Sequence, residues 1–213
     1  MNIFRLAGDL SHVLSLIFLF MKIRSTKSCA GISFKSQLLY LIVFVTRYLD
    51  LFTTFISVYN TAMKILFIAT AAYVLYLMRT KYKLTYDQEH DTFRVTFLLA
   101  MAAVLALVWP YRYTPLEVLW TFSLWLESVA ILPQLFVLQT TGECENLTSH
   151  YLFALGAYRA LYALNWVYRY LTEPGYWQPE TWVAGTIQTA LYADFFYYYI
   201  LSRRRGRKLK LPA

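Results

Sequence analysis

Long apolar runs, separated by short polar segments, set the pattern of hydrophobic and polar positions along this chain. Several runs approach the roughly 20 residues that a helix needs to cross a bilayer. The runs are continuously apolar and do not alternate residue by residue, which disfavours a transmembrane barrel. The pattern predicts an all-α integral membrane protein with seven transmembrane helices, at about residues 1–21, 37–55, 58–78, 96–110, 115–138, 149–171 and 178–201.

Polar side chains within the sixth run share one helical face. At about 100° per residue they form a narrow stripe, opposite a face of alanine, leucine and valine. The stripe consists of Tyr158, Tyr162, Asn165 and Arg169, with Arg159 and Trp166 on its flank. Ionisable residues at membrane depth face a bundle interior or a wet cavity and commonly serve a function. The stripe therefore predicts a binding cavity; the alternative is a structural Arg–Glu pair between helices.

Ionisable and aromatic residues also interrupt the other apolar runs. They are Arg5, Asp9 and His12 in the first run, Arg47, Tyr48 and Asp50 in the second, Glu117, Trp120 and Glu127 in the fifth, and Asp194 in the seventh. Lys64 in the third run is expected to snorkel to a membrane interface.

Composition supports a membrane location and narrows the function. The chain is 59% hydrophobic and 15% charged, unlike a soluble domain. Its net charge of +8 forms no soluble basic face, so we expect no nucleic-acid partner. His12, His90 and His150 are too scattered for a metal site, and no cofactor is expected. Glu117 and Glu127 lie about 15 Å apart on one helix, too far for a catalytic carboxylate pair, so an enzyme is not expected.

Basic residues in the loops predict the orientation of the chain. A basic cluster between residues 22 and 35 follows the first run, whereas the loops assigned to the opposite side carry only Arg112. By the positive-inside rule, the N-terminus is lumenal and the tail, residues 202–213, is cytosolic. Basic residues of the tail are Arg203, Arg204, Arg205, Arg207, Lys208 and Lys210. Cys29 and Cys144 fall in cytosolic loops and are expected to be free thiols.

A faint internal repeat relates the two halves of the chain. A shift of 115 residues places Cys29 on Cys144 and Asp50 on Asn165. We expect one seven-helix domain over the whole chain, built from two parallel three-helix repeats and a linker helix. The repeats cover about 1–78 and 115–201, and the linker covers about 96–110.

Parallel repeats of this kind occur in SWEET transporters. Leu132-Pro133-Gln134-Leu135 resembles the PQ-loop motif of that wider superfamily, although a proline kink in a membrane helix is the simpler reading. A small-solute transporter of the SWEET or PQ-loop kind is therefore the alternative function.

The depth of the polar residues indicates the ligand. Side chains near the lumenal ends of the predicted helices are Arg5, Asp50, Glu117 and Arg169, and those near mid-membrane are His12, Glu127, Tyr158 and Arg159. Several guanidiniums without enough acids are costly unless a ligand brings anions, and arginine prefers carboxylates and phosphates. This funnel suits a small ligand that is anionic at several points and cationic at one. A concentration of arginines toward one side disfavours a transporter, whose site should lie near the midplane.

The sequence resembles the KDEL receptors, which return escaped lumenal proteins to the endoplasmic reticulum (ER). The resemblance runs from end to end and rests on the segments MNIFRLAGDLSH, KSCAGIS, TRYLDLF, DTFRV, PLEVLWTFSLWLESVAILPQLF, YRALYALNW and LPA. It implies a pH-dependent receptor that binds C-terminal KDEL-type signals in the Golgi and returns them through COPI-coated vesicles. A protein of this kind spans the bilayer of the Golgi, of COPI vesicles and of the ER.

The resemblance also implies a role for each polar residue. The terminal carboxylate would bind Arg47 and Tyr48, the glutamate Arg5, and the aspartate Arg169. The lysine would bind Asp50 and Glu117, with Trp166 beside it for a cation–π contact. Trp120, Tyr162 and Asn165 would line the groove, Glu127, Tyr158 and Arg159 would form a deep polar lock, and His12 would sense protons. Asp194 would couple binding to transport, and the basic tail would bind the COPI coat. The tail departs from the family pattern because no hydroxyl residue follows Ser202, which puts its phosphorylation in doubt.

Overall fold

The computed structural model describes residues 2–110, 112–142, 144–205 and 209. Their regular secondary structure is helical, and the one β-type pairing among them is an isolated antiparallel bridge between Cys144 and Leu209. The elements are α1 (Ile3–Thr26), α2 (Phe34–Arg47), η1 (Leu49–Phe52), α3 (Val58–Arg79), η2 (Lys83–Thr85), α4 (Val95–Val108), α5 (Pro115–Val129), α6 (Leu132–Thr141), α7 (Asn146–Thr172), α8 (Pro179–Leu191) and α9 (Ala193–Arg204). The all-α prediction is thus confirmed for the described residues.

The helices match the expected apolar runs, with differences at their ends and in their continuity. Three helical stretches, Ile3–Thr26, Val58–Arg79 and Pro115–Thr141, are long and apolar enough to cross a membrane, and Val95–Val108 is a shorter apolar helix. The second run was expected to stay helical to residue 55, but α2 ends at Arg47 and a short 3₁₀ helix follows. The fifth and seventh runs each divide into two helices.

Polar caps explain where several helices begin. The side chains of Asn2, Ser33, Ser57 and Thr114 accept a hydrogen bond from the backbone N–H three residues further on, at the start of α1, α2, α3 and α5. Such caps satisfy N–H groups that have no partner within the helix. In α1, α3 and α5 the cap lies at the same end of the bundle, where the site described below opens.

Pro133 and Gln134 define the break between α5 and α6. Pro133 occupies the first turn of α6, where its missing N–H costs little. Gln134 is fully buried; its side chain accepts from the Ser33 N–H at 2.9 Å and donates to the Gly31 carbonyl at 2.8 Å. Ser36 closes the gap by donating its hydroxyl to the Ala130 carbonyl at 2.8 Å. The hydrogen bonds of Gln134 and Ser36 therefore connect the break between α5 and α6 to the start of α2.

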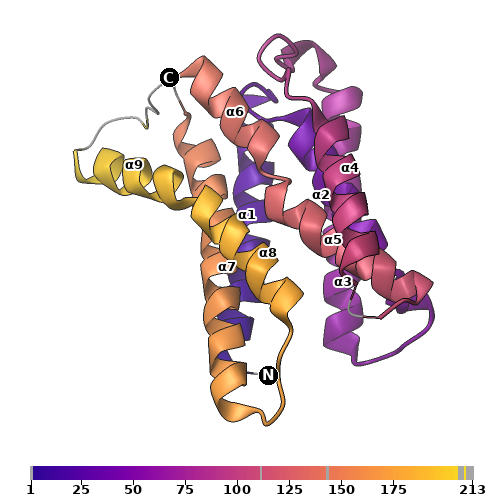
Figure 1. Ribbon diagram of the computed structural model, residues 1–213. Helices are drawn as coiled ribbons and strands as arrows, with labels where there is room; N and C mark the ends of the chain where they lie inside the picture. Colours follow the sequence, from indigo (N-terminus) through magenta and orange to yellow (C-terminus); the bar gives the residue numbers. More distant parts are fainter. Residues whose placement is uncertain (1, 111, 143, 206–208, 210–213) are drawn as a thin grey trace.

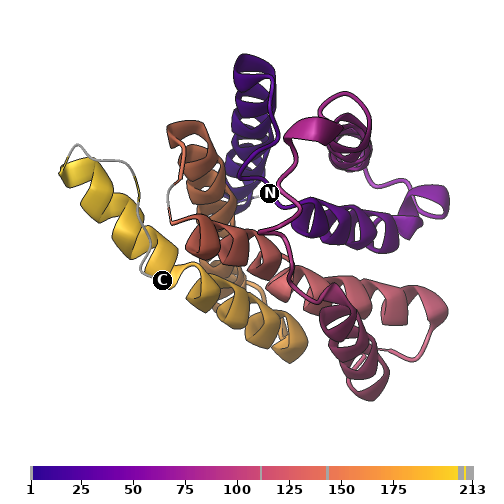
Figure 2. The ribbon, with the colours of Figure 1, turned by 90° about the horizontal axis from the view of Figure 1, so that it is seen from above.

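Packing of the helices creates one bundle with two distinct ends (Figures 1 and 2). α1 packs along α7, α2 packs against α3 and α5, and α5 also packs against α4 and α8. In Figure 1 the N-terminus, the end of α7 and the start of α8 lie at the bottom, and the end of α6 lies at the top. α9 follows α8 after Tyr192, changes direction, and extends away from the bundle.

The upper end of the bundle buries an unexpected lysine. The Lys22 ammonium is fully buried; it donates to the carbonyls of Ser28 and Ala30 at 3.1 and 2.6 Å and lies 3.5 Å from a Glu145 carboxylate oxygen. Cys29 and Cys144, in the adjoining loops, are buried free thiols as expected. Burial raises the pKa of Cys29 to about 11 and that of Cys144 to about 12, so neither is a reactive thiolate.

Candidate binding cavity

A cavity of about 600 Å³ reaches from the end of the bundle where α1, α3 and α5 begin to the middle of α7, at Tyr158 and Arg159. Its walls come from α1, α3, α5 and α7, from the start of α8, from η1 and from the last turn of α2. The structure brings into its walls the fourteen binding and proton-sensing residues to which the sequence analysis gave a role: Arg5, His12, Arg47, Tyr48, Asp50, Glu117, Trp120, Glu127, Tyr158, Arg159, Tyr162, Asn165, Trp166 and Arg169. The cavity is large enough for a short peptide segment or a small molecule.

Glu127 forms the centre of the deep end. Its carboxylate forms ion pairs with Arg47 of α2 and Arg159 of α7 and accepts a hydrogen bond from the Tyr158 hydroxyl. Two guanidiniums on one carboxylate leave a net positive charge. Arg47 Nη2 and Arg159 Nε are buried without a hydrogen-bond partner among the described residues. The deep end therefore retains both charge and donors for an anion.

His12 lies beside this cluster, one aromatic ring away from Glu127. Its imidazole stacks between the rings of Phe67 and Tyr158, with centroids 4.3 Å from each. The Tyr158 hydroxyl bonds Glu127, and the Arg159 guanidinium carbon lies 4.9 Å from the Tyr158 ring centroid. A proton gained by His12 would therefore add charge next to an existing cluster of charges.

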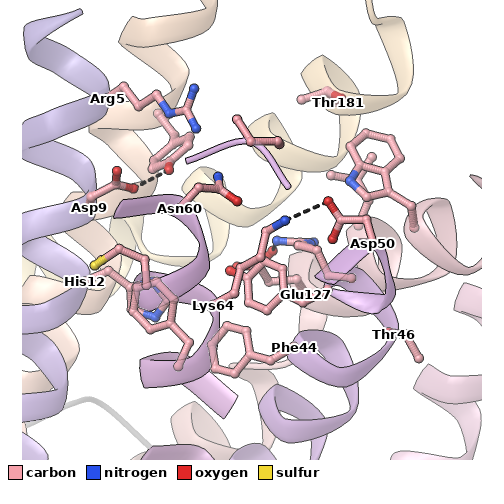
Figure 3. A pocket seen from close by; sticks show the side chains of 18 of the residues that line it. Arg5, Asp9, His12, Phe44, Thr46, Asp50, Asn60, Lys64, Glu127 and Thr181 are labelled. Atoms are coloured by element: carbon pink, nitrogen blue, oxygen red, sulfur yellow. Dashed lines mark hydrogen bonds and ion pairs between the residues drawn. The ribbon is translucent and has the colours of Figure 1, made fainter. Parts of the chain in front are cut away.

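Lys64 occupies a different position from the one expected. It does not snorkel to an interface: its buried ammonium bonds an Asp50 carboxylate oxygen at 2.6 Å inside the cavity (Figure 3). The interface prediction was wrong because η1 places Asp50 opposite α3, and a buried pair avoids an uncompensated charge. The other Asp50 carboxylate oxygen is buried and has no hydrogen-bond partner in the described part of the chain.

Asp9 anchors the wall between α1, α3 and α7. Its carboxylate oxygens accept hydrogen bonds from the Tyr59 hydroxyl at 3.0 Å and the Tyr162 hydroxyl at 2.5 Å. Arg5 lies one turn away on the same helix, nearer the mouth (Figure 3). Asn165 accepts from the side-chain amide of Asn2 at 2.7 Å. These bonds fix polar side chains that the sequence analysis placed in the groove.

An arginine and an acid from neighbouring helical turns meet at the mouth. Arg169 Nε lies 3.0 and 2.9 Å from the two Glu173 carboxylate oxygens, and Arg169 Nη2 lies 2.7 Å from one of them. The Arg169 guanidinium also covers the Tyr176 ring, with its carbon 4.0 Å from the ring centroid. Trp166 is buried one turn deeper, where its indole lies against Gly185 of α8.

Sequence reasoning left several cavity residues unassigned. Asp9 and Lys64 carried a usable signal because each is ionisable within an apolar run. Glu173 lies four residues after Arg169, the spacing at which helical side chains pair. Tyr59 and Tyr176 carried no comparable signal, because tyrosine is abundant throughout this sequence.

Those residues assigned to transport that the structure describes lie outside the cavity. Asp194 is exposed in the first turn of α9, and Arg203, Arg204 and Arg205 are exposed at its end. Arg207, Lys208 and Lys210 lie outside the described residues.

Comparisons with known proteins identify the family of this chain. The sequence profile of the family "ER lumen protein retaining receptor" matches residues 28–169. An ER lumen protein-retaining receptor of Drosophila melanogaster is 61% identical over the full length of both chains, and ER lumen protein-retaining receptor 2 of Gallus gallus is 57% identical over the same span. A receptor of this name from Entamoeba histolytica is 54% identical over 99% of each chain.

Over the described residues the fold is that of a helical membrane protein with a charged cavity, and the family whose profile the sequence matches is a family of receptors. The chain belongs to the family of ER lumen protein-retaining receptors. It is a membrane protein of the secretory pathway, and nothing in the comparisons favours the transporter alternative.

Proposed function

We propose that this protein binds the C-terminal KDEL-type signals of escaped ER lumenal proteins and returns them from the Golgi to the ER. The observation that carries the proposal is the deep end of the cavity, where two guanidiniums share one carboxylate and retain unpaired donors. A chain terminus with three carboxylates and one ammonium matches the excess of positive charge there and the acids near the mouth.

Each part of the signal has a proposed partner. The terminal carboxylate binds Arg47 and Tyr48, and the penultimate glutamate binds Arg5. Arg169 takes the aspartate. The lysine ammonium binds Asp50 and Glu117 and stacks on Trp166, while Trp120, Tyr162 and Asn165 line the groove. Support comes from the shared cavity, in which all these residues lie.

The proposal includes an orientation and a fold. The chain crosses the membrane seven times, with α5–α6 and α8–α9 each forming one span, and its two halves form parallel three-helix repeats around a linker helix, α4. The mouth of the cavity faces the lumen, and the basic tail faces the cytosol, where it binds the COPI coat. Basic residues in the loops at the upper end of the bundle, and their scarcity in the loops at the mouth end, support this orientation.

Binding is proposed to strengthen in the more acidic Golgi and weaken near neutrality. Histidine is the side chain whose charge ordinarily changes in that interval. His12 borders the ion cluster formed by Glu127, Arg47 and Arg159, with Tyr158 between them. This position supports a role for His12 as the proton sensor and for Glu127, Tyr158 and Arg159 as the polar lock.

Titration of purified protein with a peptide ending in Lys-Asp-Glu-Leu tests the proposal. We expect saturable binding that is tighter at mildly acidic pH. A matched peptide with an amidated C-terminus should bind far more weakly because it lacks the carboxylate proposed for Arg47. Equal binding of both peptides, or none by either, would reject the assignment. Flux of small solutes in proteoliposomes would instead support a transporter.

A further inference from the structure

The Arg169 guanidinium is paired with the carboxylate of Glu173 within the same chain. Glu173 meets the Arg169 guanidinium through three contacts of 2.7 to 3.0 Å, a geometry in which both carboxylate oxygens and two guanidinium nitrogens take part. A ligand carboxylate would need the same donors, because a planar guanidinium offers its N–H groups along fixed edges.

The residues around the pair limit how a ligand carboxylate can reach the Arg169 guanidinium. Tyr176 covers one face of the guanidinium, with its ring centroid 4.0 Å from the guanidinium carbon. Both Arg169 and Tyr176 line the main cavity. The turn that carries Glu173 and Tyr176 is fixed by a hydrogen bond from the Tyr176 N–H to the Glu173 carbonyl at 3.3 Å and by Gly175, whose φ of +75° suits glycine. Glu173 is therefore presented to Arg169 by a defined turn.

The pair is suited to exchange rather than to permanent closure. Glu173 caps the C-terminal end of α7, where a negative charge is unfavourable to the helix dipole. The side chains of Arg169 and Glu173 are 36% and 49% exposed, and exposed pairs four residues apart on a helix are weak. Arg169 nevertheless lowers the pKa of Glu173, so the acid remains ionised at neutral and mildly acidic pH.

We infer that Glu173 competes with the acidic residue of the ligand for the Arg169 guanidinium. This competition determines which ligands the Arg169 subsite accepts. The inference rests on the proposed function, in which Arg169 takes the aspartate of the signal. When no ligand is bound, Glu173 would neutralise Arg169 through the pair seen in the structure. A ligand must bring its own carboxylate to displace Glu173, and a ligand with an amide at that position leaves the internal pair intact.

Substitution Glu173→Gln isolates this competition, because Glu173 is exposed and glutamine preserves its shape. We expect the variant to bind the Lys-Asp-Glu-Leu peptide about two- to fivefold more tightly than wild type, the range given by release of an exposed ion pair. A Lys-Asn-Glu-Leu peptide should bind both proteins equally. In an Arg169→Gln background, Glu173→Gln should have no effect on either peptide.

Glu89→Gln is the matched control, since it removes one exposed acid from the loop at the opposite end of the bundle and should change no affinity. Unchanged affinity of Glu173→Gln for the aspartate peptide, with wild type binding normally, would overturn the inference and leave the proposed function standing. An equal gain for both peptides would also overturn it, because general repulsion at the mouth would then explain the effect. Failure of wild type to bind either peptide would reject the proposed function itself.

Discussion

Several charged side chains of the cavity pair with one another, although the deep end keeps a net positive charge. Arg47 pairs with Glu127, Lys64 pairs with Asp50, and Arg169 binds an acid one turn away. Buried charge without a partner is costly, so a cavity that awaits a charged ligand needs counterions of its own. Ligand binding then exchanges ion pairs instead of filling a cavity of unpaired charges. The net free energy of ligand binding is smaller because internal ion pairs must break first. The same pairs stabilise the folded protein when no ligand is bound.

Asp50→Asn tests the lysine subsite at the residue scale. The substitution removes the proposed partner of the ligand ammonium and leaves the Lys64 ammonium at 2.6 Å from an amide. We expect the Lys-Asp-Glu-Leu peptide to lose about 2–5 kcal/mol of binding free energy, the usual range for a broken buried charge pair. Calorimetric titration measures the loss, and Asp87→Asn, in the loop at the opposite end, serves as control. A peptide with alanine in place of lysine should lose much less; an equal loss would remove Asp50 from the subsite.

Sequence reasoning grouped these residues better than it paired them. Periodicity within α7 placed Tyr162 and Arg169 on one face, and the structure has both in the cavity wall. The partner of Lys64 could not be read from the sequence, because it depends on the 3₁₀ turn that carries Asp50 toward α3. Pairing between distant segments is a property of the packed bundle and not of either segment alone.

Packing between α7 and α8 controls the position of Trp166 at the element scale. A Cβ atom on Gly185 would overlap the six-membered part of the Trp166 ring. Gly185→Ala should therefore displace the indole, destabilise the fold by about 1–3 kcal/mol as overpacking does, and weaken binding of lysine-containing peptide.

Gly156→Ala provides the matched comparison for that variant. Its added methyl would lie 2.7 Å from atoms of Tyr192 and Phe196, away from the cavity walls. Thermal unfolding should show a similar loss for both variants, whereas peptide titration should show weaker binding only for Gly185→Ala. Equal affinities of the two variants would show that Trp166 is not a ligand contact.

α9 is the element that the sequence predicted least well. Apolar residues continue through 178–201 and predict one helix, but the chain bends at Tyr192 and α9 leaves the bundle. Tyr192 itself is fully buried; its ring lies against Gly156 of α7 and its hydroxyl lies 3.5 Å from that of Tyr40, so the bend coincides with a packed tyrosine and not with a proline or glycine. Hydropathy reports which residues avoid water and carries no information on such a bend.

Asp194 lies just after this bend, in the first turn of α9, where its negative charge stabilises the N-terminal end of the helix. In the described part of the chain its side chain makes no ion pair and no hydrogen bond. We expect Asp194→Asn to keep its peptide affinity and to lose retrieval, measured by secretion of a KDEL-ended reporter from cells. Loss of both activities would indicate a structural role.

Coupling between the two ends is a property of the whole molecule. The cavity opens at one end of the bundle, and the exposed arginines of α9 lie toward the other (Figure 1). A ligand can change the tail only by favouring one of two arrangements of the helices, and it favours that arrangement by its difference in affinity for the two. The family resemblance extends over the whole sequence and predicts a binding cavity at one end and a basic tail at the other. Hydropathy and residue spacing do not specify how the helices are arranged when ligand is bound.

The pH dependence of binding joins the deep end of the cavity to this equilibrium. The ligand brings more carboxylate than ammonium, so a more positive cavity binds it better. His12 is buried between Phe67 and Tyr158, beside the cluster of Glu127 with its two arginines. If the bound state favours protonated His12, linkage requires protonation to favour ligand by the same factor. A tenfold change in affinity needs only about 1.4 kcal/mol of such coupling.

Peptide affinity between about pH 5.5 and 7.5, a range that brackets the reference pKa of histidine, tests this linkage. Wild type should bind more tightly as the pH falls, because the ligand then meets one more positive charge. In His12→Ala the slope should flatten, since no imidazole remains to take up the proton. In Glu127→Gln the affinity should change by a similar factor at every pH. The slope of affinity against pH should stay as in wild type, because His12 is still present. A full wild-type slope in His12→Ala, lost instead in Glu127→Gln, would transfer the role of proton acceptor to Glu127, the carboxylate on which both buried guanidiniums of the cavity converge.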